Sequence, residues 1–375
     1  MRRFDHSLEH QSLGRQTLVS SLHFGSAGLG PKAYIQASLH AEELPGMLVA
    51  FHLRALLESA EQLGRVRGEV VLVPVANPIG LAQRLDHKNM GRFELGSSEN
   101  FNRNYPDLAA VVHDQVKHQL GAHAQANTAI VRAAVREYVA QWQPANGLQS
   151  LRKTLVALAC DADVVLDLHC DCEAVLHIYT ETPCWPRLEP LSRLLGARAV
   201  LLAHHAGGIS FDECFSGLWW KLADRLRKEG LAHPLEQACV STTVELRSES
   251  DVSHGMAQTD AAAIFAYLQH EGLIEGAIPP LPAALCEATP LTGSQTVKAP
   301  VAGLLVFARA PGDTLRRGDT VAQIIDPIAN TTTPVLAEVD GVMYARTYDR
   351  YVLPNDDLAN IAGSVPFRTG DLLGA

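Results

Sequence analysis

The sequence predicts a layered α/β domain followed by a small all-β domain, on three observations. Over the first three-quarters of the chain, short apolar strand-like runs alternate with longer stretches of helical periodicity. The composition shifts near residue 277, and residues 278–284 are rich in proline and resemble a linker. Beyond them, short strand-like runs are separated by glycines. Because 375 residues exceed one average domain, we expect two domains, residues 1–277 and 285–375.

The strands expected in the first domain are short, largely apolar and followed by polar residues, as in a sheet covered on both faces. They span residues 33–39, 69–75, 164–168, 197–202 and 239–246. Helical spacing follows the first of them, and Pro45 stands where a first helical turn tolerates proline. Residues 108–158 also have helical periodicity, which is broken at residues 144–147.

Composition and charge argue against several classes of protein. A formal charge of −10 and a pI near 5.9 leave no basic surplus to neutralise phosphates, so nucleic-acid binding is not expected. The first residues lack the apolar core of a signal peptide, and no apolar run reaches membrane-spanning length. Seven scattered cysteines, an odd number, indicate reduced thiols. We therefore expect a cytoplasmic protein without a membrane partner.

Polar residues with metal-ligand chemistry stand at the ends of the expected strands. His40, His169 and Glu245 each lie at or near such an end, and in open α/β sheets these ends converge in one crevice. His40 and Glu43, three residues apart where a helix begins, can point at one ion, and His169 is the best-placed third ligand. A catalytic zinc takes about three protein ligands and keeps one position open. With 16 histidines in the chain, the spacing of His40 and Glu43 alone is also compatible with chance.

Two other groups of residues suggest a site, each with a structural alternative. Glu245 stands among β-branched residues, where a buried acid is unfavourable unless it has a role. The alternative for Glu245 is an ion pair with Arg247, since residues i and i+2 of a strand share a face. Asn102 and Arg103 could anchor a substrate carboxylate, because a guanidinium group matches it in a bidentate pair. The alternative is a turn with a solvated arginine.

Taken together, these motifs resemble the succinylglutamate desuccinylase/aspartoacylase family, relatives of the zinc carboxypeptidases. The matching pieces occur in family order, at residues 40–43, 77–80, 102–103, 167–169 and 243–245. The resemblance implies a zinc-carboxypeptidase-like three-layer α/β/α fold with a mixed central sheet, and one zinc ion per chain. It assigns zinc binding to His40, Glu43 and His169, substrate-carboxylate binding to Asn102 and Arg103, and water activation to Glu245.

The resemblance leaves the remaining substrate contacts less defined. In the family an arginine before the Asn-Arg pair polarises the scissile carbonyl; Arg92 is our candidate and Arg84 the alternative. Arg247 stands where many desuccinylases carry a small residue, and we count it with the substrate-binding candidates. Residues 207–213 are similar to the subgroup that acts on N-acetylated diamino acids, which implies an acid such as Asp212 or Glu213 for the substrate amine. No residue matches the tyrosine that lies over the substrate in carboxypeptidases.

The C-terminal domain resembles the barrel-sandwich fold of biotinyl and lipoyl carriers. Such carriers present a lysine on a hairpin between their two halves, whereas the corresponding residues 326–334 contain none. A carrier role is therefore not expected. In the related enzymes a C-terminal β domain narrows the site, which favours small acyl amino acids over peptides.

The expected function is zinc-dependent hydrolysis of the amide bond of a small N-acyl amino acid, which makes the protein a deacylase. A metallocarboxypeptidase acting on short peptides is the alternative; it shares the zinc chemistry and differs in access to the cleft. A zinc-stabilised binding protein would require the pattern of Glu245 and Arg103 to be accidental. The expected partner is a small-molecule substrate. The sequence does not decide whether the chain forms a homo-oligomer.

Overall fold

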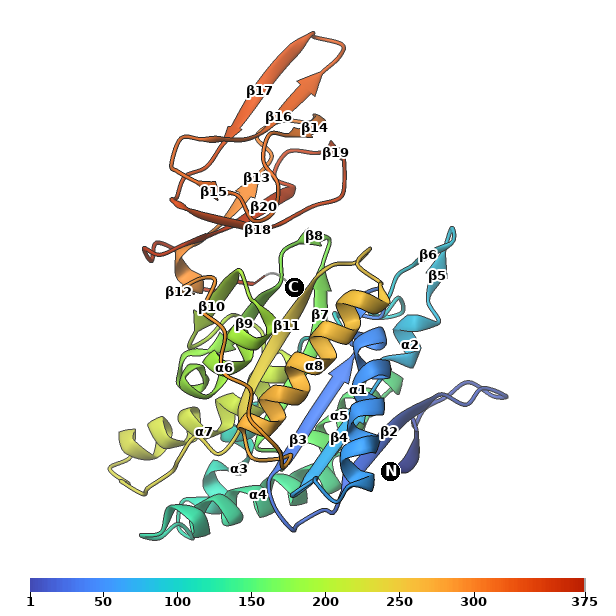
Figure 1. The fold of residues 1–375 in the computed structure, drawn as a ribbon, viewed down its shortest axis with the longest axis vertical. Helices are drawn as coiled ribbons and strands as arrows, with labels where there is room; N and C mark the ends of the chain where they lie inside the picture. Colours follow the sequence, from blue (N-terminus) through green and yellow to red (C-terminus); the bar gives the residue numbers. More distant parts are fainter. Residues whose placement is uncertain (374–375) are drawn as a thin grey trace.

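The computed structural model describes residues 1–373 and contains one large mixed sheet and a C-terminal region of smaller sheets (Figure 1). The large sheet has nine strands, in the order β1 (Arg2–Ser7), β2 (Leu18–Gly25), β4 (Glu69–Val73), β3 (Lys32–Ala37), β7 (Val164–Asp171), β11 (Val240–Ser248), β9 (His177–Glu181), β10 (Ala199–Ala203) and β12 (Ala288–Pro290). The five strands expected from the sequence are β3, β4, β7, β10 and β11. The predicted α/β class with a mixed central sheet is confirmed.

Strand direction makes this sheet mixed. Strands β4, β3, β7 and β11 are parallel neighbours, and most of their residues are buried. Strand β9 then pairs with β11 in the antiparallel direction, and β10 and β12 run parallel to β9. At the opposite edge, β2 is antiparallel to β4 and β1 to β2.

Helices cover both faces of the large sheet (Figure 1). One face is covered by α1 (Pro45–Gln62), α6 (Trp185–Leu195) and α8 (His254–His270). The other face is covered by α3 (Leu108–Val116), α4 (Ala124–Gln141), α5 (Gly147–Ala159) and α7 (Phe211–Lys228). The helical stretch expected over residues 108–158 is interrupted at residues 142–146, close to the predicted break at 144–147, and also between α3 and α4. In residues 1–373 no helix is long and apolar enough to cross a membrane.

Short elements complete this region. Helix α2 (Pro78–Leu81) begins at Asn77, whose Oδ1 accepts a hydrogen bond from Gly80 N at 2.8 Å and caps the helix. A small hairpin of β5 (Arg84–Leu85) and β6 (Lys88–Asn89) follows it. Two 3-10 turns, η1 (Thr182–Cys184) and η2 (Leu291–Gly293), end β9 and β12 respectively.

The C-terminal region packs two antiparallel sheets around a core of its own. One sheet contains β13 (Ser294–Lys298), β20 (Asp357–Gly363), β18 (Gly341–Arg346) and β15 (Thr314–Leu315). The other contains β17 (Thr331–Leu336), β16 (Thr320–Asp326), β14 (Gly303–Phe307) and β19 (Tyr351–Val352). Strand β12 belongs to the large sheet although it follows the expected linker. The division at residues 277 and 285 therefore stays a prediction.

The C-terminal sheets dock beside the end of β7. The short strand β8 (Glu173–Ala174) follows β7 directly and pairs in the antiparallel direction with β18. Glu173 also accepts charged hydrogen bonds from Arg346 Nε at 2.5 Å and Arg350 Nη2 at 2.7 Å. These contacts attach the C-terminal region at the edge of the large sheet where β7 ends.

Candidate functional site

Three parallel strands end at one edge of the sheet and carry the polar residues expected there. Strands β3, β7 and β11 are neighbours, and Glu245 of β11 is the direct register partner of His169 of β7. His40 follows β3, and Glu43 precedes α1. A Cβ on Gly46, in the first turn of α1, would lie 3.0 Å from the Cβ atoms of Ala37 and Leu168. Glycine at this position thus lets the start of α1 approach β3 and β7 closely.

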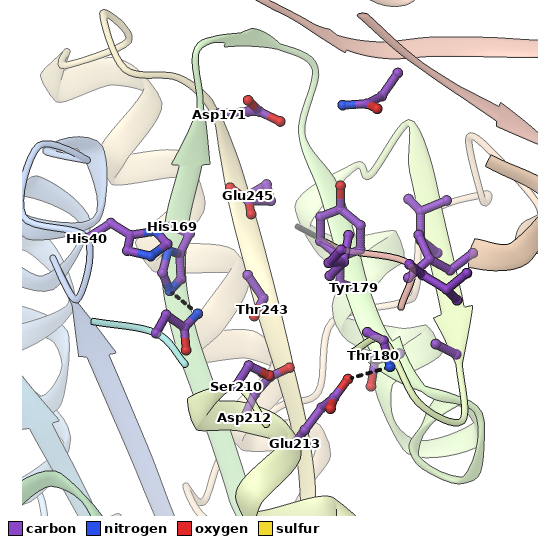
Figure 2. A pocket seen from close by; sticks show the side chains of 18 of the residues that line it. His40, His169, Asp171, Tyr179, Thr180, Ser210, Asp212, Glu213, Thr243 and Glu245 are labelled. Carbon is purple, nitrogen blue, oxygen red and sulfur yellow. Dashed lines mark hydrogen bonds between the residues drawn. The ribbon is translucent and has the colours of Figure 1, made fainter. Parts of the chain in front are cut away.

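The structure brings His40, Glu43 and His169 into one buried cluster (Figure 2). Their candidate ligand atoms all lie within 4.8 Å of one another. His40 Nδ1 is 2.9 Å from Glu43 Oε1, and His169 Nδ1 is 2.7 Å from Glu43 Oε2. Two imidazoles and one carboxylate are a ligand set of catalytic zinc sites. The three residues therefore fit a metal ion of this kind.

The far nitrogen of each imidazole lies close to an oxygen of a neighbouring side chain. His40 Nε2 is 2.8 Å from Asn100 Oδ1, and His169 Nε2 is 2.9 Å from Asp167 Oδ2. Arg152 Nη2 donates a hydrogen bond to the backbone carbonyl of Asn100 at 3.1 Å. Such contacts orient metal-binding histidines in known sites. The sequence did not single out Asn100 or Arg152, because neither stands in a recognisable spacing with His40.

Charges in the cluster favour a cation at its centre. Burial opposes the ionisation of Glu43, but the imidazoles of His169 and His40 hold its pKa well below the usual range. Burial lowers the pKa of His40 to about 4, helped by the Arg92 guanidinium, so this imidazole is neutral near pH 7. Burial also opposes the charge of His169, yet Asp167 and Glu43 raise its pKa well above the usual value. Two carboxylates thus stabilise positive charge at the position of His169.

Glu245 lies in the same cavity with a carboxyl oxygen that has no partner. Its Oε2 is buried and forms no hydrogen bond among the described residues. Burial, and then the Glu43 carboxylate, raise the pKa of Glu245 well above its usual value. A carboxyl group in this environment can hold a proton near neutral pH.

The structure separates Arg247 from Glu245 and from the cavity. The register of β11 shifts between Glu245 and Ser248, and Arg247 has a left-handed φ of 70°. Its guanidinium group forms an ion pair with Asp260 of α8 and does not line the cavity. In a regular strand, Arg247 would share a face with Glu245. The register shift interrupts this alternation of side chains between the two faces. Arg247 thus lies outside the described cavity, and its role in substrate binding stays a prediction; the alternative, an ion pair with Glu245, is not formed within residues 1–373.

Arg247→Met should destabilise the protein, because it leaves the buried Asp260 carboxylate without its cation. Removing one partner of a buried ion pair lowers the free energy of unfolding by about 3 kcal/mol, which urea unfolding would measure. Unchanged stability together with a raised KM would instead return Arg247 to the substrate site.

The other expected substrate residues line the cavity. Arg92 Nη1 donates a hydrogen bond to Glu43 Oε1 at 3.1 Å, whereas Arg84 is exposed and bonds to the His87 carbonyl. Asn102 Oδ1 accepts a hydrogen bond from Phe211 N at 2.8 Å, where α7 begins. Arg103 lies beside it, and Asp212 lines the same cavity. Of the two arginines considered for the carbonyl, only Arg92 is placed at the cluster.

The cavity has a volume of about 320 Å³ and is also lined by residues that the sequence did not indicate. Figure 2 shows Tyr179 of β9 facing Glu245 from the opposite wall. Thr296 of β13, with Asp357 and Asn360 of β20, contributes from the C-terminal sheets. The C-terminal strands thus lie at the cavity, as expected from the sequence. Only the long-range pairing of these strands brings the residues there, so no local motif could have revealed them.

The comparisons with known proteins agree with the resemblance. Residues 29–132 match the family described as the succinylglutamate desuccinylase/aspartoacylase catalytic domain. No curated protein matches the sequence. The match confirms the resemblance over the segment that contains His40, Glu43, Arg92, Asn102 and Arg103.

Solved structures extend the likeness to the whole chain. A protein of the succinylglutamate desuccinylase/aspartoacylase family from Shewanella amazonensis is 25% identical, with a TM-score of 0.84 over 96% of this chain and 98% of that chain. One from Shewanella frigidimarina is 24% identical, with a TM-score of 0.82 over 96% and 97%. The ectoine utilization protein of Ruegeria pomeroyi is 14% identical, with a TM-score of 0.67 over 96% and 95%. The last two show the shared fold.

Proposed function

We propose, from its resemblance to the succinylglutamate desuccinylase/aspartoacylase family, that this chain is a zinc-dependent deacylase of a small N-acyl amino acid. One observation carries the proposal: Glu245 and His169 are register partners in a cavity that also contains His40 and Glu43. Metal-assisted amide hydrolysis uses a general base beside a bound metal ion. Two imidazoles and a carboxylate form a suitable set of ligands for that ion.

The metal would be held by His40, Glu43 and His169. When bound, zinc polarises the amide carbonyl and lowers the pKa of water. Asn100 and Asp167 keep the two imidazole rings oriented toward it.

Glu245 moves the proton. Its carboxylate accepts a proton from water as the water oxygen forms a bond to the amide carbon. The carbon–nitrogen bond then breaks, and Glu245 returns the proton to the leaving amine nitrogen. The unpartnered Oε2 and the raised pKa of Glu245 support this role, because the protonated form must persist between the two steps. The products are a carboxylic acid and a free amino acid.

Two arginines and an asparagine would position the substrate. Arg92, at the cluster, stabilises the negative charge that develops on the carbonyl oxygen. Arg103 and Asn102 bind the carboxylate of the amino acid, for which a guanidinium group has a matching geometry. Both sets of residues line the same cavity as Glu245.

The size of the cavity favours a small substrate over a peptide. Its volume of about 320 Å³ is at the lower end of the range for small-molecule sites, about 300–1,000 Å³. The C-terminal strands contribute part of its wall through Thr296, Asp357 and Asn360. A metallocarboxypeptidase of short peptides remains the alternative, since it would use the same zinc chemistry.

We also propose that the protein acts without a nucleic-acid or membrane partner, and within the cytoplasm.

The substrate range tests the proposal. Zinc-loaded protein should hydrolyse at least one member of a panel of acetyl, succinyl and formyl amino acids. Its kcat/KM should exceed that for peptides of five residues with the same C-terminal residue by about 10-fold or more, because a small cavity cannot hold the longer chain. Release of free amine measures both rates. Faster cleavage of the peptides would support the carboxypeptidase alternative instead.

A further inference from the structure

The cavity has an apolar wall that faces the expected metal ligands. Figure 2 shows Tyr179 across the cavity from His40 and His169. Leu201 of β10 is the register partner of Tyr179 of β9, and both side chains line the cavity. Three other parts of the chain add four apolar residues to the lining, Ala206, Leu291, Leu372 and Leu373. We call these six residues the apolar wall.

The apolar wall is the open side of a small hydrophobic core where β10 meets β18 and β20. Tyr344 of β18 packs in this core with four members of the wall, Leu201, Ala206, Leu291 and Leu372. The other two members, Tyr179 and Leu373, are partly buried and pack against the same core. The wall is therefore one contiguous surface, and packing from behind holds it in place.

Backbone hydrogen bonds hold the last part of the wall against the loop before α7. Leu372 N and Leu373 N both donate to the Ala206 carbonyl oxygen at 2.8 Å. Arg368 Nη2 donates to the Leu372 carbonyl oxygen at 2.5 Å, so this segment is bonded on both sides. These bonds fix the two leucines at the cavity.

The same loop connects the apolar wall to the expected carboxylate anchor. Gly207 and Gly208 have left-handed φ angles of 100° and 52°. A Cβ on Gly207 would lie 2.6 Å from Asp371 Cβ, and a Cβ on Gly208 would lie 3.1 Å from Arg103 Cδ. Without side chains, this turn of the loop contacts the C-terminal segment on one side and Arg103 on the other. The apolar wall thus adjoins the residue expected to bind the substrate carboxylate.

Charges in the cavity favour a neutral group at the apolar wall. Within residues 1–373, the lysines and arginines that line the cavity are Arg92 and Arg103, and the proposed function uses both for the carbonyl oxygen and the carboxylate. Arg103 and Lys221 lie within electrostatic reach of the carboxylates that also line it, Glu181, Asp212 and Glu213. A second substrate carboxylate would therefore meet like charges and no further cation. An ammonium group placed on the wall would lose its water against apolar side chains.

We infer that the apolar wall receives an uncharged aliphatic side chain of the amino acid that the reaction releases. The inference rests on the proposed deacylase function and narrows its substrate class to N-acyl derivatives of aliphatic amino acids. It differs from the diamino acids implied by the resemblance of residues 207–213. The amide carbonyl faces the metal ligands, the carboxylate faces Arg103, and the side chain lies on the neighbouring wall.

A series of substrates with one acyl group tests the inference. The derivatives of alanine, 2-aminobutyrate and norvaline differ by one carbon at each step, and the acyl group is the best one of the panel. Each added carbon should raise kcat/KM by about 3-fold, because it leaves water for an apolar surface. The aspartate and ornithine derivatives, with charged side chains, should be slower than the norvaline derivative by about 10-fold or more. A flat series, or a charged substrate as fast as the norvaline derivative, would overturn the inference.

Variants of the wall locate the preference. In Leu373→Asn, which keeps the size of the side chain, the ratio of kcat/KM for norvaline over alanine should fall toward one. Leu373→Trp fills space beside the wall and should slow the norleucine derivative more than the alanine derivative. Leu353→Asn is the matched control, because Leu353 is 53% exposed and outside the cavity, and it should keep the ratio.

Thermal unfolding checks that each variant keeps the fold, which we expect because Leu373 is only partly buried. An unchanged norvaline preference in Leu373→Asn, together with an unchanged norleucine rate in Leu373→Trp, would contradict the inference.

A binding experiment separates this inference from the proposed function. If no N-acyl amino acid is hydrolysed, the proposed function fails, and free norvaline and free alanine are titrated into the protein by calorimetry. Binding of norvaline about 10-fold more tightly than alanine, with the difference lost in Leu373→Asn, would support the apolar wall alone. Equal binding of the two amino acids, or binding of neither, would overturn it.

Discussion

Glu245→Gln is expected to lower kcat by about 10²-fold or more, as for a missing general base. Glutamine keeps the size of the side chain but cannot carry a proton from water to the leaving amine. Metal content and thermal unfolding should stay near those of the unmodified protein, because Glu245 is not among the expected ligands and its Oε2 has no hydrogen-bond partner within residues 1–373. Steady-state rates and elemental analysis measure the two quantities.

Glu236→Gln provides the control for Glu245→Gln. It makes the same chemical change at an exposed residue outside those that line the cavity. Its rates should stay close to those of the unmodified protein. Turnover of Glu245→Gln near the unmodified rate would remove Glu245 from the mechanism, and an unfolded variant would indicate a structural role instead.

His169→Ala is expected to lose the metal and, with it, the activity. His169 lies between Glu43 and Asp167. Its removal deletes one expected metal ligand and leaves these two carboxylates without the imidazole that lies between them. Loss of even an outer partner of a metal ligand weakens metal affinity by about 10–100-fold, and loss of the ligand should exceed that. Elemental analysis after dialysis measures the metal remaining per chain.

The histidine variants carry their own control. His40→Ala should lose metal as His169→Ala does, whereas His52→Ala, on the outer surface of α1, should retain it. Full metal retention in both His40→Ala and His169→Ala would contradict the assignment of the ligands.

The sequence predicted the centre of the fold well, because that part depends on local signals. Strands β3, β7 and β11 are buried and rich in apolar or β-branched residues, and polar residues near their ends belong to the site. Parallel neighbours place those ends at one edge, so His40, His169 and Glu245 could be grouped without coordinates. Strand β1 was missed because it is largely exposed, with a polar sequence at the sheet edge.

The walls of the cavity could not be predicted in the same way. Tyr179 and Glu181 reach it because β9 inserts in the antiparallel direction next to β11, a pairing of distant segments with no local signature. Asn360 reaches it through the docking of β18 on β8. Arg247 was misplaced because a β-strand pattern cannot reveal a register shift with a left-handed residue.

Removal and return of the metal test the central claim most directly. The protein is stripped with a chelator, dialysed, and assayed on the acyl amino acid panel before and after addition of one equivalent of zinc per chain. The account predicts that amine release is lost in the stripped protein and restored by zinc in the unmodified chain, but not in His169→Ala. Equal rates before and after stripping, or no hydrolysis of any acyl amino acid by the zinc-loaded protein, would contradict it.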